Sequence, residues 1–217
     1  MKDEPIGLPQ KQAISQCRRC QLRARQITEG LGNAVRKIGS LCASCQCGKV
    51  VFEAAFAPIL AVSCYCTSCQ KAGHAFEKMP SAPPVLDADG GTPVLMYRKD
   101  RVRCVRGLEL LEARKLKPDS PSRRIFTTCC NSAMLGDFTK GHWLSLYRKR
   151  FAGEVPPMQM RIMTKERPAG IVLREDVPNY DGFSGKFALK LIAAWVAMGF
   201  RRPDMGLAHI PQSIFKG

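Results

Sequence analysis

The chain has 217 residues, of which 45% are hydrophobic and 24% charged, and this balance excludes a globally disordered protein. No apolar stretch approaches the roughly 20 residues that a membrane-spanning helix needs, and the polar residues 1–5 lack the apolar region of a secretory signal. We therefore expect a soluble cytoplasmic protein without a transmembrane segment. Two values stand out, namely the eleven cysteines and the formal net charge of +16.

Residues 1–40 are predicted to form a basic N-terminal extension. A thin apolar series among polar and basic residues is compatible with one or two weak helices. The extension contains a C-x-x-C motif, Cys17 and Cys20, and the basic residues Arg18, Arg19, Arg23 and Arg25. We interpret the two cysteines as free thiols rather than as a metal knuckle, because the other cysteine groups are better assigned elsewhere.

Residues 41–151 have the pattern of a mainly β domain. Apolar and β-branched runs separated by turn residues predict strands at residues 49–56, 59–64, 94–97, 102–105, 124–128 and 143–147. A short helix is predicted over residues 67–76, and a turn over residues 87–91.

Residues 152–217 are predicted to be a C-terminal extension with one apolar helix. The segment 154–157, Glu-Val-Pro-Pro, has the composition of a linker. The helix is expected over Phe187–Phe200, with Ser184 as its N-cap and Gly199 as its stop signal. Because it is apolar nearly all round, we expect it to be buried rather than to rest on a partner or membrane surface.

The strongest local signal is the run Cys64-Tyr-Cys66-Thr-Ser-Cys69. Without a secretory signal, clustered cysteines more often bind metal or do redox chemistry than form disulfides. Three thiolates on a tetrahedral zinc ion leave one position open, which is the arrangement of a catalytic zinc. The alternative is a closed structural site with a fourth ligand from elsewhere, for which His74 is the nearest candidate.

A second cysteine group spans the predicted β domain. Cys45 and Cys47 form a C-x-C-G motif, and Cys129 and Cys130 are adjacent at the far end. Together they can form a four-sulfur zinc site that stabilises the fold directly. Adjacent cysteines are a strained pair of ligands, so Cys130 is the surer member and Cys42 is an alternative to Cys129.

These motifs, in this order, resemble the glutathione-dependent formaldehyde-activating enzyme family, which includes centromere protein V. The resemblance covers residues 41–147 and rests on C-x-C-G, C-x-C-x-x-C-Q, a Gly-rich turn and R-x-F-x-x-x-C. It implies a β-tent fold with one or two zinc ions. The structural ligands would be Cys45, Cys47, Cys130 and one more cysteine, and the catalytic ligands would be Cys64, Cys66 and Cys69.

The sequence departs from that family near its end. Thr127 stands at a cysteine position of the family motif, and Asn131 stands at a glycine position. The resulting C-C-N ending resembles a less characterised branch of the superfamily, which also carries an apolar C-terminal segment.

The resemblance implies a zinc-dependent carbon–sulfur lyase. Its substrate would be S-hydroxymethylglutathione, the adduct of glutathione and formaldehyde, so glutathione is an expected co-substrate. Arg98, Arg101 and Arg103 are candidates for binding the glutathione carboxylates, because guanidinium groups match carboxylates. Tyr65 and His74 are the candidate bases.

Two other functions compete with this hypothesis. Segment 98–150 contains fourteen basic and five acidic residues, so a non-catalytic zinc module could bind nucleic acid or an acidic partner through a basic surface. A redox or metal-handling role would use Cys17, Cys20, Cys42 and Cys104. That role is the weakest of the three, because no βαβ unit surrounds the C-x-x-C motif.

Overall fold

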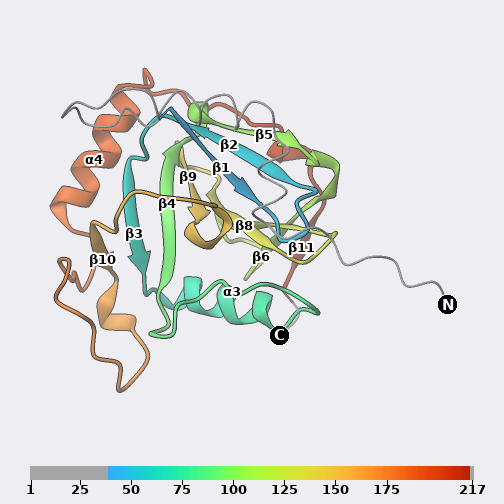
Figure 1. The fold of residues 1–217 in the computed structure, drawn as a ribbon. Coiled ribbons are helices and arrows are strands. Elements are labelled where there is room, and N and C mark those ends of the chain that lie inside the picture. Colours follow the sequence, from blue (N-terminus) through green and yellow to red (C-terminus); the bar gives the residue numbers. More distant parts are fainter. Residues whose placement is uncertain (1–38, 216–217) are drawn as a thin grey trace.

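The computed structural model describes residues 39–215, in which eleven strands form two sheets and two α-helices lie beside the larger sheet (Figure 1). The predicted mainly β fold is confirmed. Of the predicted N-terminal extension, residues 1–40, the part up to residue 38 lies outside the described residues. Cys17 and Cys20 belong to this part.

The smaller sheet is antiparallel and has the order β1-β2-β5, and the larger sheet has the order β10-β3-β4-β9-β8-β7-β6-β11. The strands of the smaller sheet are β1 (Ser40–Ser44), β2 (Val51–Ala55) and β5 (Val102–Arg106). Those of the larger sheet are β3 (Leu60–Cys64), β4 (Thr92–Arg98), β6 (Leu111–Lys115), β7 (Ser122–Thr127), β8 (Ala133–Phe138), β9 (Trp143–Tyr147), β10 (Met160–Ile162) and β11 (Gln212–Ile214). The α-helices are α3 (Thr67–Glu77) and α4 (Gly185–Val196), and short 3-10 helices are η1 (Lys99–Arg101), η2 (Leu108–Leu110), η3 (Arg148–Arg150), η4 (Thr164–Glu166) and η5 (Leu207–His209).

The larger sheet is buried on both faces. Successive side chains of a strand point to opposite faces, so each strand contributes to two hydrophobic clusters. In β4, Leu95 and Tyr97 pack with residues of the smaller sheet, whereas Val94 and Met96 pack on the side of α3 and α4. Phe76 of α3 and Phe187 of α4 belong to this second cluster. The helices therefore cover one face of the larger sheet, and the smaller sheet covers the other.

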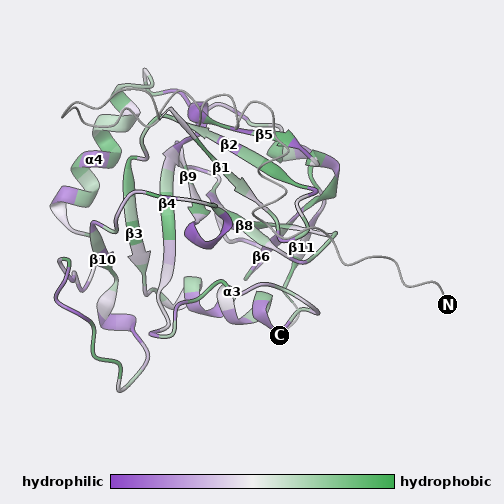
Figure 2. Cartoon of the chain, in the orientation of Figure 1, coloured by the Kyte–Doolittle hydropathy of each residue, from purple (hydrophilic) through white to green (hydrophobic). Residues whose placement is uncertain are grey.

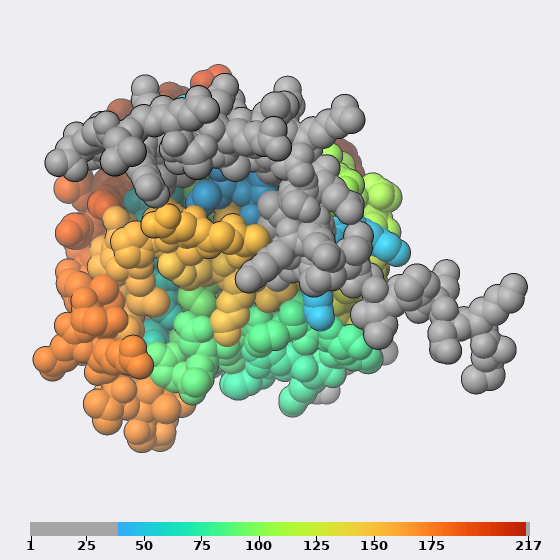
Figure 3. All heavy atoms as spheres, viewed as in Figure 1, coloured from blue at the N-terminus to red at the C-terminus, as the bar shows by residue number. Residues whose placement is uncertain are grey.

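The residues after β9 extend the larger sheet at both edges. β10 pairs in parallel with β3, and β11 pairs in parallel with β6. In Figure 3 the segment after η3, coloured yellow-orange to orange, lies next to the residues of α3. The division into a β domain at 41–151 and an extension at 152–217 remains a prediction.

The C-terminal apolar helix forms, but only part of it is buried. Ser184 caps α4 as predicted, since its Oγ accepts the backbone N–H of Phe187 at 3.1 Å. One stripe, represented by Phe187, packs on the sheet, while Leu189, Ile192 and Val196 are 67%, 55% and 54% exposed. Figure 2 shows the mostly hydrophobic colour of this helix. The expected complete burial is therefore wrong, because packing every fourth residue on a flat sheet leaves the opposite side uncovered. Neither described α-helix has the length and apolar character that a bilayer crossing requires.

Candidate metal centre and adjoining cavity

Four cysteines from opposite ends of the β domain meet at the first candidate site. Cys45 and Cys47 follow β1, Cys129 and Cys130 follow β7, and their sulfur atoms all lie within 4.8 Å of one another. The Sγ atoms of Cys47 and Cys129 are 3.3 Å apart, and those of Cys45 and Cys47 are 3.6 Å apart. Thiolates bound tetrahedrally at a zinc–sulfur distance of about 2.3 Å would be about 3.8 Å apart, so this arrangement fits a zinc ion.

Two backbone turns bring these sulfur atoms together. Gly48 donates its N–H to the Cys45 carbonyl at 3.0 Å and has a φ of +74°, which glycine adopts without steric cost. Asn131 has a φ of +52°, so it supplies the left-handed residue where the resemblance leads us to expect glycine. Thr127 is buried with its Oγ1 3.5 Å from the Cys130 Sγ. The fourth sulfur atom of this group belongs to Cys129 and not to Cys42.

The second group forms where β3 runs into α3. Cys64 ends β3, Cys66 is the N-cap of α3 and Cys69 lies in its first turn, and their sulfur atoms lie within 4.8 Å of one another. The Cys69 N–H donates to the Cys66 carbonyl at 2.9 Å, which curls the loop. Within residues 39–215, no further His, Cys, Asp or Glu joins the three, and the exposed His74 lies outside the group. Three sulfur ligands of this kind fit a zinc ion with one open position.

The C-terminal segment holds this cysteine loop in place. Glu166 accepts hydrogen bonds from both the backbone N–H and the hydroxyl of Thr67, each at 2.7 Å. The Gln70 amide donates to the Glu166 carbonyl at 2.7 Å and also to the Tyr65 carbonyl. Cys66 makes no side-chain cap, so Glu166 supplies the acceptor and the negative charge that the N-terminus of α3 favours.

Crowding of the three thiols makes their acidities unequal. The pKa of Cys66 is lowered to about 3, first by hydrogen bonds from Cys64 and Cys69 and also by the positive charge of Arg124. The pKa of Cys64 is raised, because its thiol donates to Cys66 and Cys69 and because it is buried. Arg124 lies close by, since its Nη2 donates to the hydroxyl of Ser68 at 2.9 Å. Cys66 is therefore the thiol that loses its proton first, and the thiolate is the form that binds metals.

A cavity of about 720 Å³ adjoins the three thiols. Cys64, Cys66 and Cys69 form part of its wall, and most of the remainder comes from the larger sheet and from α4. Its apolar lining includes Val62, Val94, Met96, Phe187, Leu191 and Trp195. The cavity lies within the size range of small-molecule sites, so a ligand held in it would reach the thiols.

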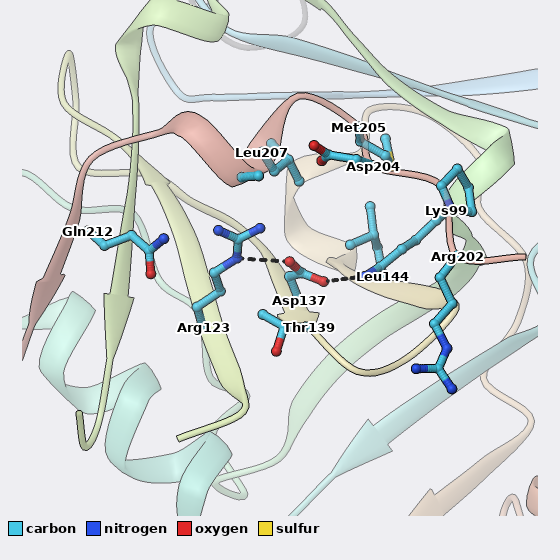
Figure 4. A pocket seen from close by; sticks show the side chains of 12 residues that line it. Lys99, Arg123, Asp137, Thr139, Leu144, Arg202, Asp204, Met205, Leu207 and Gln212 are labelled. Carbon is cyan, nitrogen blue, oxygen red and sulfur yellow. Dashed lines mark hydrogen bonds and ion pairs between the residues drawn. The ribbon is translucent and has the colours of Figure 1, made fainter. Parts of the chain in front are cut away.

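A smaller cavity of about 410 Å³ lies beside a buried group of charges (Figure 4). Asp137 forms ion pairs with Lys99 and Arg123, each at 2.9 Å, and the three side chains are 3%, 9% and 8% exposed. Arg123 and Asp137 also line the larger cavity, so these charged side chains lie between the two cavities.

The arginines predicted to bind glutathione do not line the larger cavity. Arg98 pairs with Asp100, Arg103 pairs with Glu53, and the Arg101 guanidinium lies 5.0 Å from the ring centroid of Phe56. These charges already have partners on the surface, and their role in glutathione binding remains a prediction without geometric support.

The candidate bases are also not at the cavity. Tyr65 is fully buried and donates to Asp89 at 2.7 Å, and burial raises its pKa to about 12. His74 is exposed on α3. Cys104 belongs to neither cysteine group and lies with its Sγ 3.2 Å from the Arg106 carbonyl.

His142 is a cavity residue that the sequence does not single out. Its Nε2 lies 2.9 Å from the Leu191 carbonyl, and its ring stacks on Trp195 at 5.5 Å. It therefore joins the turn before β9 to α4. Burial lowers the pKa of His142, and the positive charges of Arg202, Lys99 and Arg98 act in the same direction. The neutral form of the His142 ring is therefore favoured while α4 packs against it.

Acidification is expected to loosen the docking of α4. Because the pKa of His142 is lower in the folded protein, the unfolded chain takes up the proton first and stability falls as pH drops below about 6.5. We expect the melting temperature of the wild type to fall more steeply between pH 7 and pH 5 than that of His142→Phe. His74→Gln is the control and should keep the wild-type slope. Parallel curves for the wild type and His142→Phe would contradict this assignment.

Comparison with known proteins supports the resemblance for part of the chain. The family model of the glutathione-dependent formaldehyde-activating enzyme matches residues 40–84, which hold Cys45, Cys47 and the three central cysteines. The resemblance inferred from the cysteine motifs is confirmed over this segment. No curated protein sequence matches the chain significantly. Among solved structures, a crystal structure of a Rhodobacter sphaeroides protein is similar at 17% identity, covering 54% of this chain and 92% of that one, with a TM-score of 0.39.

Proposed function

We propose, from the family resemblance over residues 40–84, that this protein is a zinc-dependent enzyme with carbon–sulfur lyase activity on a thiol–aldehyde adduct such as S-hydroxymethylglutathione. One observation carries the proposal. Cys64, Cys66 and Cys69 bring three sulfur atoms together without a fourth protein ligand among the described residues, and all three line a cavity large enough for a substrate.

The reaction needs a stabilised thiolate. A zinc ion held by three cysteines would keep one open position and would lower the pKa of a thiol bound there. In the lyase direction, the carbon–sulfur bond of the adduct breaks and its electron pair stays on the sulfur. The hydroxyl oxygen of the adduct becomes the aldehyde oxygen, and its proton passes to water. In the reverse direction, the thiolate adds to the carbonyl carbon and the oxygen takes up a proton.

The residues of the chain supply orientation and charge for this step. The curled loop of α3 and the hydrogen bonds of Glu166 and Gln70 fix the three sulfur atoms relative to the cavity. Arg124 places a positive charge beside them, which contributes to the lowered pKa of Cys66. The lining of the cavity is mostly apolar, so this charge is screened less than it would be in bulk water.

The test is the rate of adduct exchange in the zinc-loaded protein. We expect wild-type protein to accelerate the exchange between formaldehyde and S-hydroxymethylglutathione, measured by NMR exchange spectroscopy. Cys66→Ser should reduce the rate to that of buffer and remove one zinc ion in native mass spectrometry. Cys104→Ser is the matched control, because Cys104 lies outside both groups. Unchanged kinetics in Cys66→Ser would refute the proposal.

No observation on the described residues favours the nucleic-acid alternative. Several of the basic side chains on which it rests are paired, as in Arg98 with Asp100, Arg103 with Glu53 and Lys149 with Asp87. Pairing reduces the charge that these residues offer to phosphate groups.

A further inference from the structure

Resting on the proposed function, we infer that the substrate is the adduct of a bulky apolar aldehyde with a thiol that carries a carboxylate, and that Arg124 is the anchor for this carboxylate. The inference deepens the proposed lyase activity, because it names the substrate class by the chemistry of the cavity. Three features carry it, namely the volume of the cavity, its apolar walls and its buried unpaired donors.

The volume is far larger than formaldehyde requires. A water molecule occupies about 30 Å³ in the liquid, and formaldehyde is little larger. The cavity of about 720 Å³ has room for the thiol part of the adduct and for an aldehyde-derived group larger than formaldehyde. The side of the cavity that α4 forms is strongly apolar, with Phe187, Leu191, Ile192 and Trp195 as lining residues. An apolar group of the substrate would be removed from water along this helix.

Two buried donors in the cavity wall lack an acceptor among the described residues. Arg124 is only 6% exposed. Its guanidinium interacts with the Tyr147 hydroxyl, but its Nη1 makes no hydrogen bond within the described part of the chain. The indole Nε1 of Trp195 is also buried without an acceptor in this part of the chain. A buried guanidinium nitrogen without an acceptor is costly, and a carboxylate would satisfy it. Arg124 lies on the same face of β7 as Phe126, which is the face toward the helices.

The other charged groups at the cavity are less suited to this role. Arg123 is paired with Asp137, while Lys140 and Arg202 are exposed to solvent. Solvent screens exposed charges, so they contribute less to the binding of an anion than a buried guanidinium does. Among the described lining residues, Arg124 is thus the buried cation without a carboxylate partner, and it lies in a cavity with one extended apolar wall.

The test uses octanoate as a probe, because it joins one carboxylate to one apolar chain. Both tryptophans of the chain, Trp143 and Trp195, line the cavity, so intrinsic fluorescence reports on its occupancy. We expect octanoate to quench the fluorescence of the zinc-loaded protein saturably. Octanamide, which has the same shape without the charge, should bind about 10- to 100-fold more weakly, as expected for a hydrogen bond to a charged group. Acetate should not bind measurably.

Variants separate the two parts of the inference. Arg124→Met should reduce octanoate affinity to that of octanamide, and Arg124→Lys should restore part of the difference. On α4, Ile192→Glu should weaken octanoate binding, whereas Leu189→Glu should not. Both residues are exposed on the same helix, and only Ile192 lines the cavity, so the second variant is a matched control for folding.

The outcomes are distinct from those of the lyase test. Equal affinity for octanoate and octanamide would overturn the role of Arg124, as would octanoate binding that survives Arg124→Met and disappears in Cys66→Ser. Absence of octanoate binding in a protein that exchanges the formaldehyde adduct would overturn the inference and leave the lyase proposal standing. Octanoate binding with the expected variant effects, but without adduct exchange, would support the binding site and refute the lyase activity.

Discussion

Cys47→Ser is expected to remove one zinc ion from each chain and to unfold most of the β domain. Cys47 and Cys45 follow β1, whereas Cys129 and Cys130 follow β7, so a metal at this site joins segments more than 80 residues apart. Structural zinc sites contribute about 10–16 kcal/mol of binding free energy in small zinc peptides, which is comparable to the whole stability of a typical domain. We expect native mass spectrometry to show the loss of one ion, and circular dichroism to show a broad, early thermal transition.

Cys104→Ser again serves as the control, because Cys104 is a partly buried cysteine on β5 that belongs to neither group. It should retain the wild-type zinc count and melting temperature. A chelator should act on the wild type as Cys47→Ser does. If Cys47→Ser keeps its full zinc content and melts with the wild type, the four cysteines do not form a structural metal site.

The strands that the sequence predicts are those with their own local signal. Trp143–Tyr147 alternates large apolar residues with smaller or polar ones and matches β9 in full. By contrast, the sequence does not predict the strand Leu111–Lys115, because Leu-Glu-Ala-Arg-Lys consists of helix-favouring residues. It is a strand because β7 pairs with it on one side and β11 on the other. Such pairing depends on residues far away in the chain, so a local sequence pattern cannot predict it.

The candidate site likewise has parts that local spacing predicts and parts that depend on the fold. Close spacing indicated the group of Cys64, Cys66 and Cys69, because ligands within one short loop need no long-range information. For the other group the sequence predicts Cys129 with Cys42 as the alternative, and only the fold, which brings the sulfur atom of Cys129 to Cys45 and Cys47, decides between them. The cavity itself could not be predicted, because its walls come from β3, β4, β9 and α4. Charge density drew attention to Arg98 and its neighbours, whereas Arg124 is distinguished by its burial.

The buried charges around Asp137 provide the second large effect. One carboxylate serves two buried cations, Lys99 and Arg123, at 2.9 Å each, and it joins β8 to η1 and to β7 (Figure 4). Such a group gains little stability over an apolar core, but the loss of one partner leaves uncompensated charge in a poorly hydrated place. Asp137→Asn preserves the shape of the side chain and removes its charge. It therefore isolates the electrostatic effect from packing.

Asp137→Asn is expected to lower the free energy of unfolding by about 3–5 kcal/mol, measured by urea denaturation of the zinc-loaded protein. Asp87→Asn makes the same substitution in an ion pair with Lys149, where the two side chains are 37% and 28% exposed, and should change the midpoint only slightly because water replaces the lost charge. Adding Lys99→Met to Asp137→Asn should recover part of the loss, since one of the two unpaired cations is then gone. If Asp137→Asn is as stable as Asp87→Asn, the cations are hydrated through the adjoining cavities and Asp137 does not hold them together.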